Sequence, residues 1–154
     1  MYADTDILAE KNYRKALSVL PNPQDWWQGE RAQAHLVGLL IKQSRWQEAL
    51  DLFAGRDSLS ASEESTVASI YSSQKQWSQA ETHYLNSFKL ANLGGQAQFA
   101  LDAALALVDL QQQAGTPEKA EAHLQFIHRE ANKSLHWVKL HKPTLDRLGI
   151  AIAE

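Results

Sequence analysis

Residues 44–53 read SRWQEALDLF and residues 75–84 read KQWSQAETHY, and the two stretches share one spacing of residue types. Each has a Trp (Trp46, Trp77), an Ala three residues later and an aromatic residue four positions beyond that Ala. A small residue followed one turn later by a bulky one suits a helix crossing, because the small residue allows close approach and the large one fills the space beside it. The spacing therefore predicts that one kind of helix packing is repeated.

The pair of Ala and bulky residue occurs four times, at Ala16/Leu20, Ala49/Phe53, Ala80/Tyr84 and Ala120/Leu124. Successive alanines are 33, 31 and 40 residues apart. An earlier apolar pattern begins 13 residues before each of the last three, at Leu36-Val37-x2-Leu40, Val67-Ala68-x2-Tyr71 and Leu107-Val108-x2-Gln111. Because this distance of 13 residues is the same in all three cases, the pattern indicates that a pair of helices is repeated.

Composition favours one globular domain over residues 1–154, with 44% hydrophobic and 21% charged residues. The net charge of -3 offers no field to attract nucleic acid or an anionic membrane, so neither is expected as a partner. The absence of Cys excludes disulfides and thiolate metal sites. No apolar run approaches the roughly 18 residues of a membrane span, and the start MYADTDILAE has no signal-peptide pattern, which favours the cytoplasm.

Helix-forming residues dominate, and the breaks between them fall at intervals that suit short helices. Asp25 is a candidate N-cap, Ser60 and Glu63 have capping-box spacing, and Gly115-Thr116-Pro117 combines a helix-ending Gly, an N-cap Thr and a Pro in the first turn. We expect helices over residues 5–20, 25–43, 46–54, 61–75, 77–93, 96–114 and 117–131, and a tail over 135–153 interrupted near Pro143.

From Tyr13 to Asn132 this pattern resembles the tetratricopeptide repeat family, whose units of about 34 residues carry Leu-Gly-x2-Tyr and Ala-x3-Phe. The resemblance implies an all-α, right-handed superhelix of antiparallel helix pairs. It divides the chain into a half repeat (5–20), repeats at about 25–54, 61–93 and 96–131, and a C-terminal cap at 135–153. The longer last spacing is similar to the extended repeats of kinesin light chains and bacterial regulators. The first helices lack the usual Gly, and the closing Pro is missing from every unit.

In this family the first helix of each pair lines a concave groove. The resemblance places in that groove Arg31, Ala34, Gly38, Ile41 and Lys42 from the first repeat, Ser62, Ser65, Ser69, Ser72 and Ser73 from the second, and Asp102, Leu105, Asp109, Gln112 and Gln113 from the third. The Lys/Asn set by which some members clamp a terminal carboxylate is missing. We expect a Ser-lined groove with a cationic end and an anionic end, suited to an extended peptide.

The chain has five Trp residues, which could either pack in the core or contact a partner. Trp46 and Trp77 fall at the turn between paired helices, where packing explains them. Trp26 and Trp27 are adjacent, so they point about 100° apart on a helix, and one of them is a candidate aromatic anchor for a partner. Trp137 is expected to cap the last repeat.

Catalytic and metal-binding patterns are weak. His123/His128 and His136/His141 are spaced by five, whereas ligands on one helix face need three or four. The chain has no GxSxG elbow and no phosphate-binding loop. Glu63-Glu64 is explained by the favourable interaction of carboxylates with a helix N-terminus. We expect no catalytic residues, no metal and no cofactor.

These patterns favour a non-catalytic scaffold module that binds a protein or a peptide. The alternative is a regulatory or sensor domain from a larger bacterial signalling protein or transcription regulator. The groove is too near neutral to favour RNA. The chain is expected to be a monomer, or a weak dimer formed through its N-terminal half repeat, because the apolar stripe of that half repeat lacks a second helix to pack on.

Overall fold

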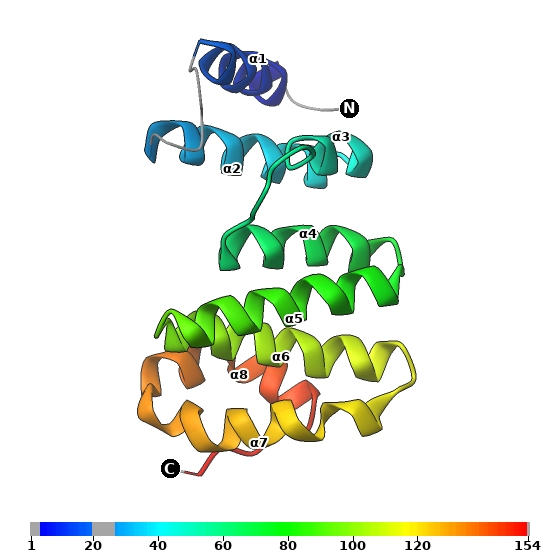
Figure 1. Cartoon of the computed structure of the whole chain (residues 1–154), viewed down its shortest axis with the longest axis vertical. Helices are drawn as coiled ribbons and strands as arrows, with labels where there is room; N and C mark the ends of the chain where they lie inside the picture. Colours follow the sequence, from blue (N-terminus) through cyan, green and yellow to red (C-terminus); the bar gives the residue numbers. More distant parts are fainter. Residues whose placement is uncertain (1–3, 20–26, 154) are drawn as a thin grey trace. The chain divides into compact units, whose positions relative to one another are not determined.

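The computed structural model describes residues 4–19 and 27–153, and these form helices with no strand among them (Figure 1). The predicted all-α class is thereby confirmed. The elements are α1 (Asp4–Ser18), α2 (Trp27–Lys42), α3 (Trp46–Asp51), α4 (Ala61–Ser73), α5 (Trp77–Leu93), α6 (Ala97–Gln113), η2 (Pro117–Ala120), α7 (Glu121–Glu130), η3 (Ala131–Lys133) and α8 (Leu135–Arg147).

Most predicted helices match these bounds within two residues, and three differ. The helix predicted for 46–54 ends at Asp51, and the one predicted for 117–131 begins with the 3-10 turn η2. The break predicted near Pro143 is wrong, because α8 continues through that residue to Arg147. A proline removes one helical hydrogen bond, but Trp137 and Leu145 are both buried and hold the helix on either side of it.

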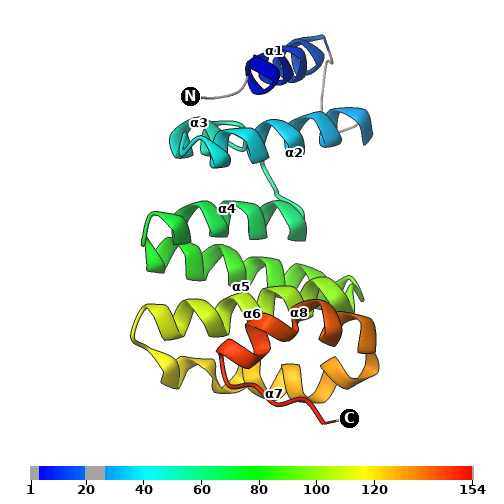
Figure 2. The same ribbon diagram turned by 180° about the vertical axis from the view of Figure 1, so that it is seen from behind.

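The chain divides into two compact units, residues 1–57 and residues 58–154. Unit 1 contains α1, α2 and α3. In unit 2, α4, α5, α6 and α7 follow one another as antiparallel neighbours, and α8 lies beside α6 (Figures 1 and 2). The right-handed superhelix concerns all the helix pairs together, and it stays a prediction.

The alanines of the repeated pattern are buried where helices meet, as predicted. Ala49 and Ala80 have no exposed surface, and Ala120 is 2% exposed. Ala80 packs in a cluster with Leu107 and Leu110 of α6 and with Tyr84 of its own helix, so its small side chain lies where large ones from the neighbouring helix approach. This is the arrangement that close helix packing requires.

Five turns in the described residues end a helix in the same way. One residue takes the left-handed conformation: Ser44, Lys75, Gly95, Gly115 or Gly149, with φ of 57, 57, 68, 75 and 70°. The amide of the next residue then donates to the carbonyl five positions earlier, as Gln76 N does to Tyr71 O at 2.9 Å. This is the Schellman motif, which satisfies carbonyls left free at the end of a helix.

The predicted caps have mixed outcomes. Ser60 and Glu63 form the capping box, with Glu63 N donating to Ser60 Oγ at 3.2 Å and Ser60 N to Glu63 Oε1 at 3.1 Å. Thr116 is not a side-chain cap, because its hydroxyl donates back to Gln111 O at 3.4 Å. Asp25 lies outside the described residues.

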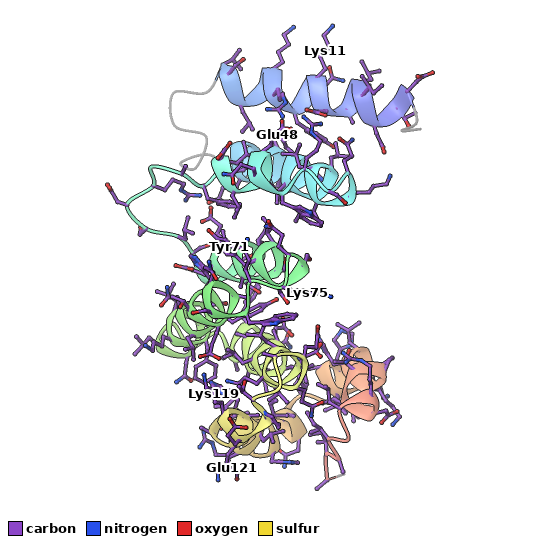
Figure 3. All side chains as sticks on the ribbon, turned by 90° about the vertical axis from the view of Figure 1, so that its right-hand side faces the viewer. Lys11, Glu48, Tyr71, Lys75, Lys119 and Glu121 are labelled. Atoms are coloured by element: carbon purple, nitrogen blue, oxygen red, sulfur yellow. The ribbon has the colours of Figure 1, made fainter. Side chains whose placement is uncertain are left out.

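Helix α1 has no buried side chain, and Ile7 and Leu8 are 60% and 58% exposed. Figure 3 shows Lys11 directed away from α2 and α3. In the apolar stripe predicted for the half repeat, Ile7 and Leu8 are thus exposed, whereas Ala16 and Leu17 are partly buried. Apolar burial therefore holds this helix only in part, and the ring of Tyr13 stacks on that of His35 of α2 with centroids 5.4 Å apart.

Ion pairs add to the attachment of α1. Arg45, in the turn between α2 and α3, binds Glu10 of α1 with both terminal nitrogens at 2.6 and 3.0 Å. Arg14 reaches Glu48 at 3.2 Å, and Lys42 reaches Asp6 at 2.9 Å. Hydrogen bonding to Arg45 lowers the pKa of Glu10 below its usual value. Exposed pairs of this kind are individually weak and are screened by salt.

Replacing Lys75 by Gly should stabilise the protein by about 0.5–1 kcal/mol. The left-handed conformation costs a side-chain-bearing residue roughly 1–2 kcal/mol, and the added chain entropy of Gly offsets only part of that. The measurement is the midpoint of urea unfolding. Gly115→Ala, at the equivalent turn, is the matched control and should destabilise by about 1 kcal/mol. A Lys75→Gly protein that unfolds at lower urea than its parent contradicts this account of the turns.

Raised salt should loosen α1 selectively. Amide hydrogen exchange in α1 should accelerate by about a few-fold, because the exposed ion pairs that hold it are weakened. The amides of α5 should stay protected. Acid should act in the same direction. The stabilisation from Glu10 is present above its unfolded pKa and is lost as pH falls through its lowered folded pKa. Arg45→Gln should remove most of the salt effect, and equal acceleration of α1 and α5 would refute this mode of attachment.

Candidate interaction surface

The serine stripe predicted to line the groove belongs to α4 in unit 2. We expected Ser65, Ser69 and Ser72 to be exposed, and this is wrong, because all three are partly buried; Ser62 is exposed. Ser69 donates its hydroxyl to Thr66 O at 2.8 Å. Serine hydroxyls in helices commonly bond to a carbonyl one turn earlier, so this one is not a free donor for a peptide.

The predicted cationic end belongs to α2 in unit 1. Arg31 and Lys42 are both exposed there, and Lys42 Nζ is 2.9 Å from Asp6 Oδ2 of α1. The predicted anchor Trp26 lies outside the described residues, and Trp27 begins α2. The predicted cation Lys42 is therefore engaged by the helix that precedes it.

The predicted anionic end belongs to α6, and the structure corrects it. Trp137 donates its indole N–H to Asp102 Oδ1 at 2.7 Å, and His141 Nε2 is 3.1 Å from the same oxygen. Arg147 donates to both oxygens of Asp109 at 3.0 and 2.8 Å, which holds the pKa of that carboxyl below its usual value. Neither carboxylate is a free end for a basic peptide residue. Gln112, also predicted in the groove, is exposed.

Helix α8 supplies these contacts because it lies along α6 (Figure 2). Leu105, another predicted groove residue of α6, is 4% exposed and belongs to the same core cluster as Trp137 and Leu145 of α8. Trp137 is 2% exposed, so the expectation that it packs against the last repeat is met. The side of α6 expected to bind a partner is covered by the chain's own last helix.

A polar cluster between α4 and α5 was not predicted. Glu64 is 9% exposed, its Oε2 lies 2.6 Å from His83 Nδ1, and the ring of Tyr71 stacks on that imidazole with centroids 5.5 Å apart. The apolar spacing through Val67 and Tyr71 could have placed Glu64 on the buried side of α4. Its contacts tie the two helices together, which gives this carboxylate a structural role.

Two features are absent from the residues that the structure describes. Their His, Asp and Glu side chains form no group of three or more that could hold a metal ion. None of the helices that they form is long and apolar enough to cross a membrane.

The turn between α5 and α6 exposes three bulky apolar side chains. Leu90, Leu93 and Phe99 are 43%, 87% and 48% exposed, and we call them the turn patch. Single exposed apolar residues are common, but several in one short segment mark an interaction site more often. The sequence contained the signal in ANLGGQAQFAL, which carries no charge.

Beside the turn patch lies an open hollow of about 150 Å³. Its lining comes from the α5–α6 turn and from α7, which reach the same edge of unit 2 in Figure 1: Ala91, Asn92, Gly95, Ala97, Phe126, Arg129 and Glu130. Each member of the turn patch lies within two positions of a lining residue in the sequence. The patch and the hollow thus lie at the same end of the α5–α6 pair, and we consider them together as a candidate surface within unit 2.

Comparison of the chain with protein-family models, with curated proteins and with solved structures gave no match. The resemblance to the tetratricopeptide repeat family therefore stays a prediction.

Replacing Asp109 by Asn should weaken the docking of α8 by about 1 kcal/mol or less, as for other partly exposed ion pairs. The effect should depend on pH. The folded pKa of Asp109 is lowered, so the stabilisation is present above the unfolded pKa and is lost as pH falls through the folded value. Urea unfolding should therefore separate the variant from its parent at neutral pH and bring the two together in acid. A gap that persists unchanged in acid would show that Arg147 does not act through the charge of Asp109.

Proposed function

We propose that this chain is a non-catalytic module that binds a protein or peptide partner, and that it does so through the turn patch. The observation that carries the proposal is the exposure of Leu90, Leu93 and Phe99 beside an open hollow. Complete burial of a fully exposed side chain of this size is worth roughly 1.5–3 kcal/mol, and the surface that these three still expose forgoes part of that free energy. A partner that covered them would recover part of that free energy.

The rest of unit 2 supports an interaction role over chemistry. Its carboxylates Glu64, Asp102 and Asp109 are engaged by groups of the same chain, in contacts that join helix to helix. These contacts account for the polar groups on α4 and α6 without assigning any of them to a reaction. The turn patch has no such internal explanation.

We further propose that the helix pairs belong to a tetratricopeptide-like array. The buried Ala49, Ala80 and Ala120 and the repeated helix-ending turn are what stacked pairs of this kind require. Arrays of this type serve as binding scaffolds, which agrees with the proposed function. The predicted groove along the first helices becomes the less favoured surface, because α8 covers α6.

The test compares the full chain with the double variant Leu93→Ser/Phe99→Ser as immobilised bait for a lysate of the native host. We expect a small set of proteins to be retained by the parent and lost on the variant, because the variant removes the apolar surface without disturbing the core. Leu140→Ser is the matched control, since Leu140 is 67% exposed on α8. Thermal unfolding checks that each variant is folded. Retention that is equal on all three proteins would reject the turn patch as the binding surface.

A further inference from the structure

The lining of the hollow beside the turn patch is partly apolar and partly polar, with Asn92 and the ion pair of Arg129 and Glu130 among its residues. Ala91, Ala97 and the ring of Phe126 form apolar parts of its lining. The guanidinium of Arg129 lies over that ring, 5.4 Å from its centroid. Its volume is about 150 Å³, and it is open to solvent. A volume of this size is on the order of that occupied by one bulky side chain.

The charges around this hollow are unlike those of the whole chain. Arg129 and Lys133, each with a side chain 66% exposed, share the single carboxylate of Glu130 at 2.9 and 2.7 Å. Lys89 is exposed on α5, three and four positions before Asn92 and Leu93, and so lies on the same side of that helix. Among the described residues, three cations thus accompany two anions, Glu130 and Asp102, the latter three positions after Phe99 on α6, although the chain carries a net charge of -3.

Carboxylates are also missing from the nearby sequence. Between Glu81 and Asp102 there is no acidic residue, and Asp102 is engaged by Trp137 and His141 of α8. Hydrogen bonds from Lys133 and Arg129 lower the pKa of Glu130, so it stays ionised and neutralises only one of the neighbouring cations. The surroundings of the turn patch therefore attract anions, whereas the chain as a whole repels them weakly.

We propose that the turn patch and its hollow bind an acidic peptide segment that inserts one bulky apolar side chain. This inference rests on the proposed function and names its partner class. The anchor, of leucine or phenylalanine size, fills the hollow and contacts Leu93, while flanking Asp or Glu residues pair with Arg129, Lys133 and Lys89. The anchor supplies most of the affinity, and the charges guide and orient the segment.

The experiment selects partners without assuming a sequence. A phage-displayed library of random peptides is panned on the immobilised full chain, with the bare support as the counter-selection. Enriched peptides are then labelled, and their affinities are measured by fluorescence anisotropy at low and high salt. The proteins compared are the parent, Leu93→Ser, Arg129→Glu, and two controls on α8, Leu140→Ser and Lys139→Glu.

We expect the enriched peptides to combine one or two bulky apolar residues with flanking Asp or Glu. Leu93→Ser should weaken them by about tenfold at either salt concentration. Arg129→Glu should weaken them by about tenfold at low salt and by less at high salt, because exposed charges are screened. Neither control should change the affinity by more than about twofold.

Enriched peptides that are basic, or whose binding is unaffected by Leu93→Ser, overturn the proposal. So does preferential binding of a single-stranded oligonucleotide at this site, or self-association of the chain that Leu93→Ser abolishes in analytical ultracentrifugation. The two proposals can be told apart. If host proteins are lost on the Leu93→Ser/Phe99→Ser bait while the selected peptides are not acidic, the proposed function is supported and only the proposed class of partner is wrong.

Discussion

A single residue in the left-handed conformation ends five helices of this chain, and the helix pairing depends on it. At four of these turns the chain reverses within two or three residues, so that the next helix returns along the one before, whereas the turn at Gly149 ends α8, the last described helix. Gly meets this requirement without strain at three of the five positions, while Ser44 and Lys75 meet it with a side chain in place. The buried alanines then allow the paired helices to approach closely. Turn geometry and small residues together produce the stacked pairs.

The two ends of the chain are held by different forces. Helix α1 buries none of its side chains and depends on ion pairs around Arg45, whereas α8 buries Trp137 and Leu145 and adds polar contacts to them. Apolar burial does not respond to moderate salt as exposed charges do. A helix attached in the first way can leave and return while the remainder stays folded. A helix attached in the second way is part of the core.

The local sequence pattern predicted most of the helices correctly but few of the residues on the candidate interaction surface. The bounds of α5 and the burial of Ala80 followed from periodicity, because these depend on residues within one or two helices. The position of α8 could not follow, because it depends on pairs such as Asp102 with Trp137, which are 35 residues apart. Once α8 covers α6, the residues assigned to a groove change their role. The prediction for the serines was wrong for a local reason: carbonyl groups within one turn of the same helix accept hydrogen bonds from serine hydroxyls.

The contact of α8 with α6 also bears on the order in which unit 2 folds. In a simple helical array each pair contacts only its neighbours, and folding can spread from any point to an end that frays. Here the last helix returns to a helix that precedes α7, so its docking closes a long loop and must wait until α6 is formed. The C-terminal end is therefore coupled to the interior of the unit. We therefore expect it to unfold together with α6 and α7 in one cooperative step, and its docking to come late in folding.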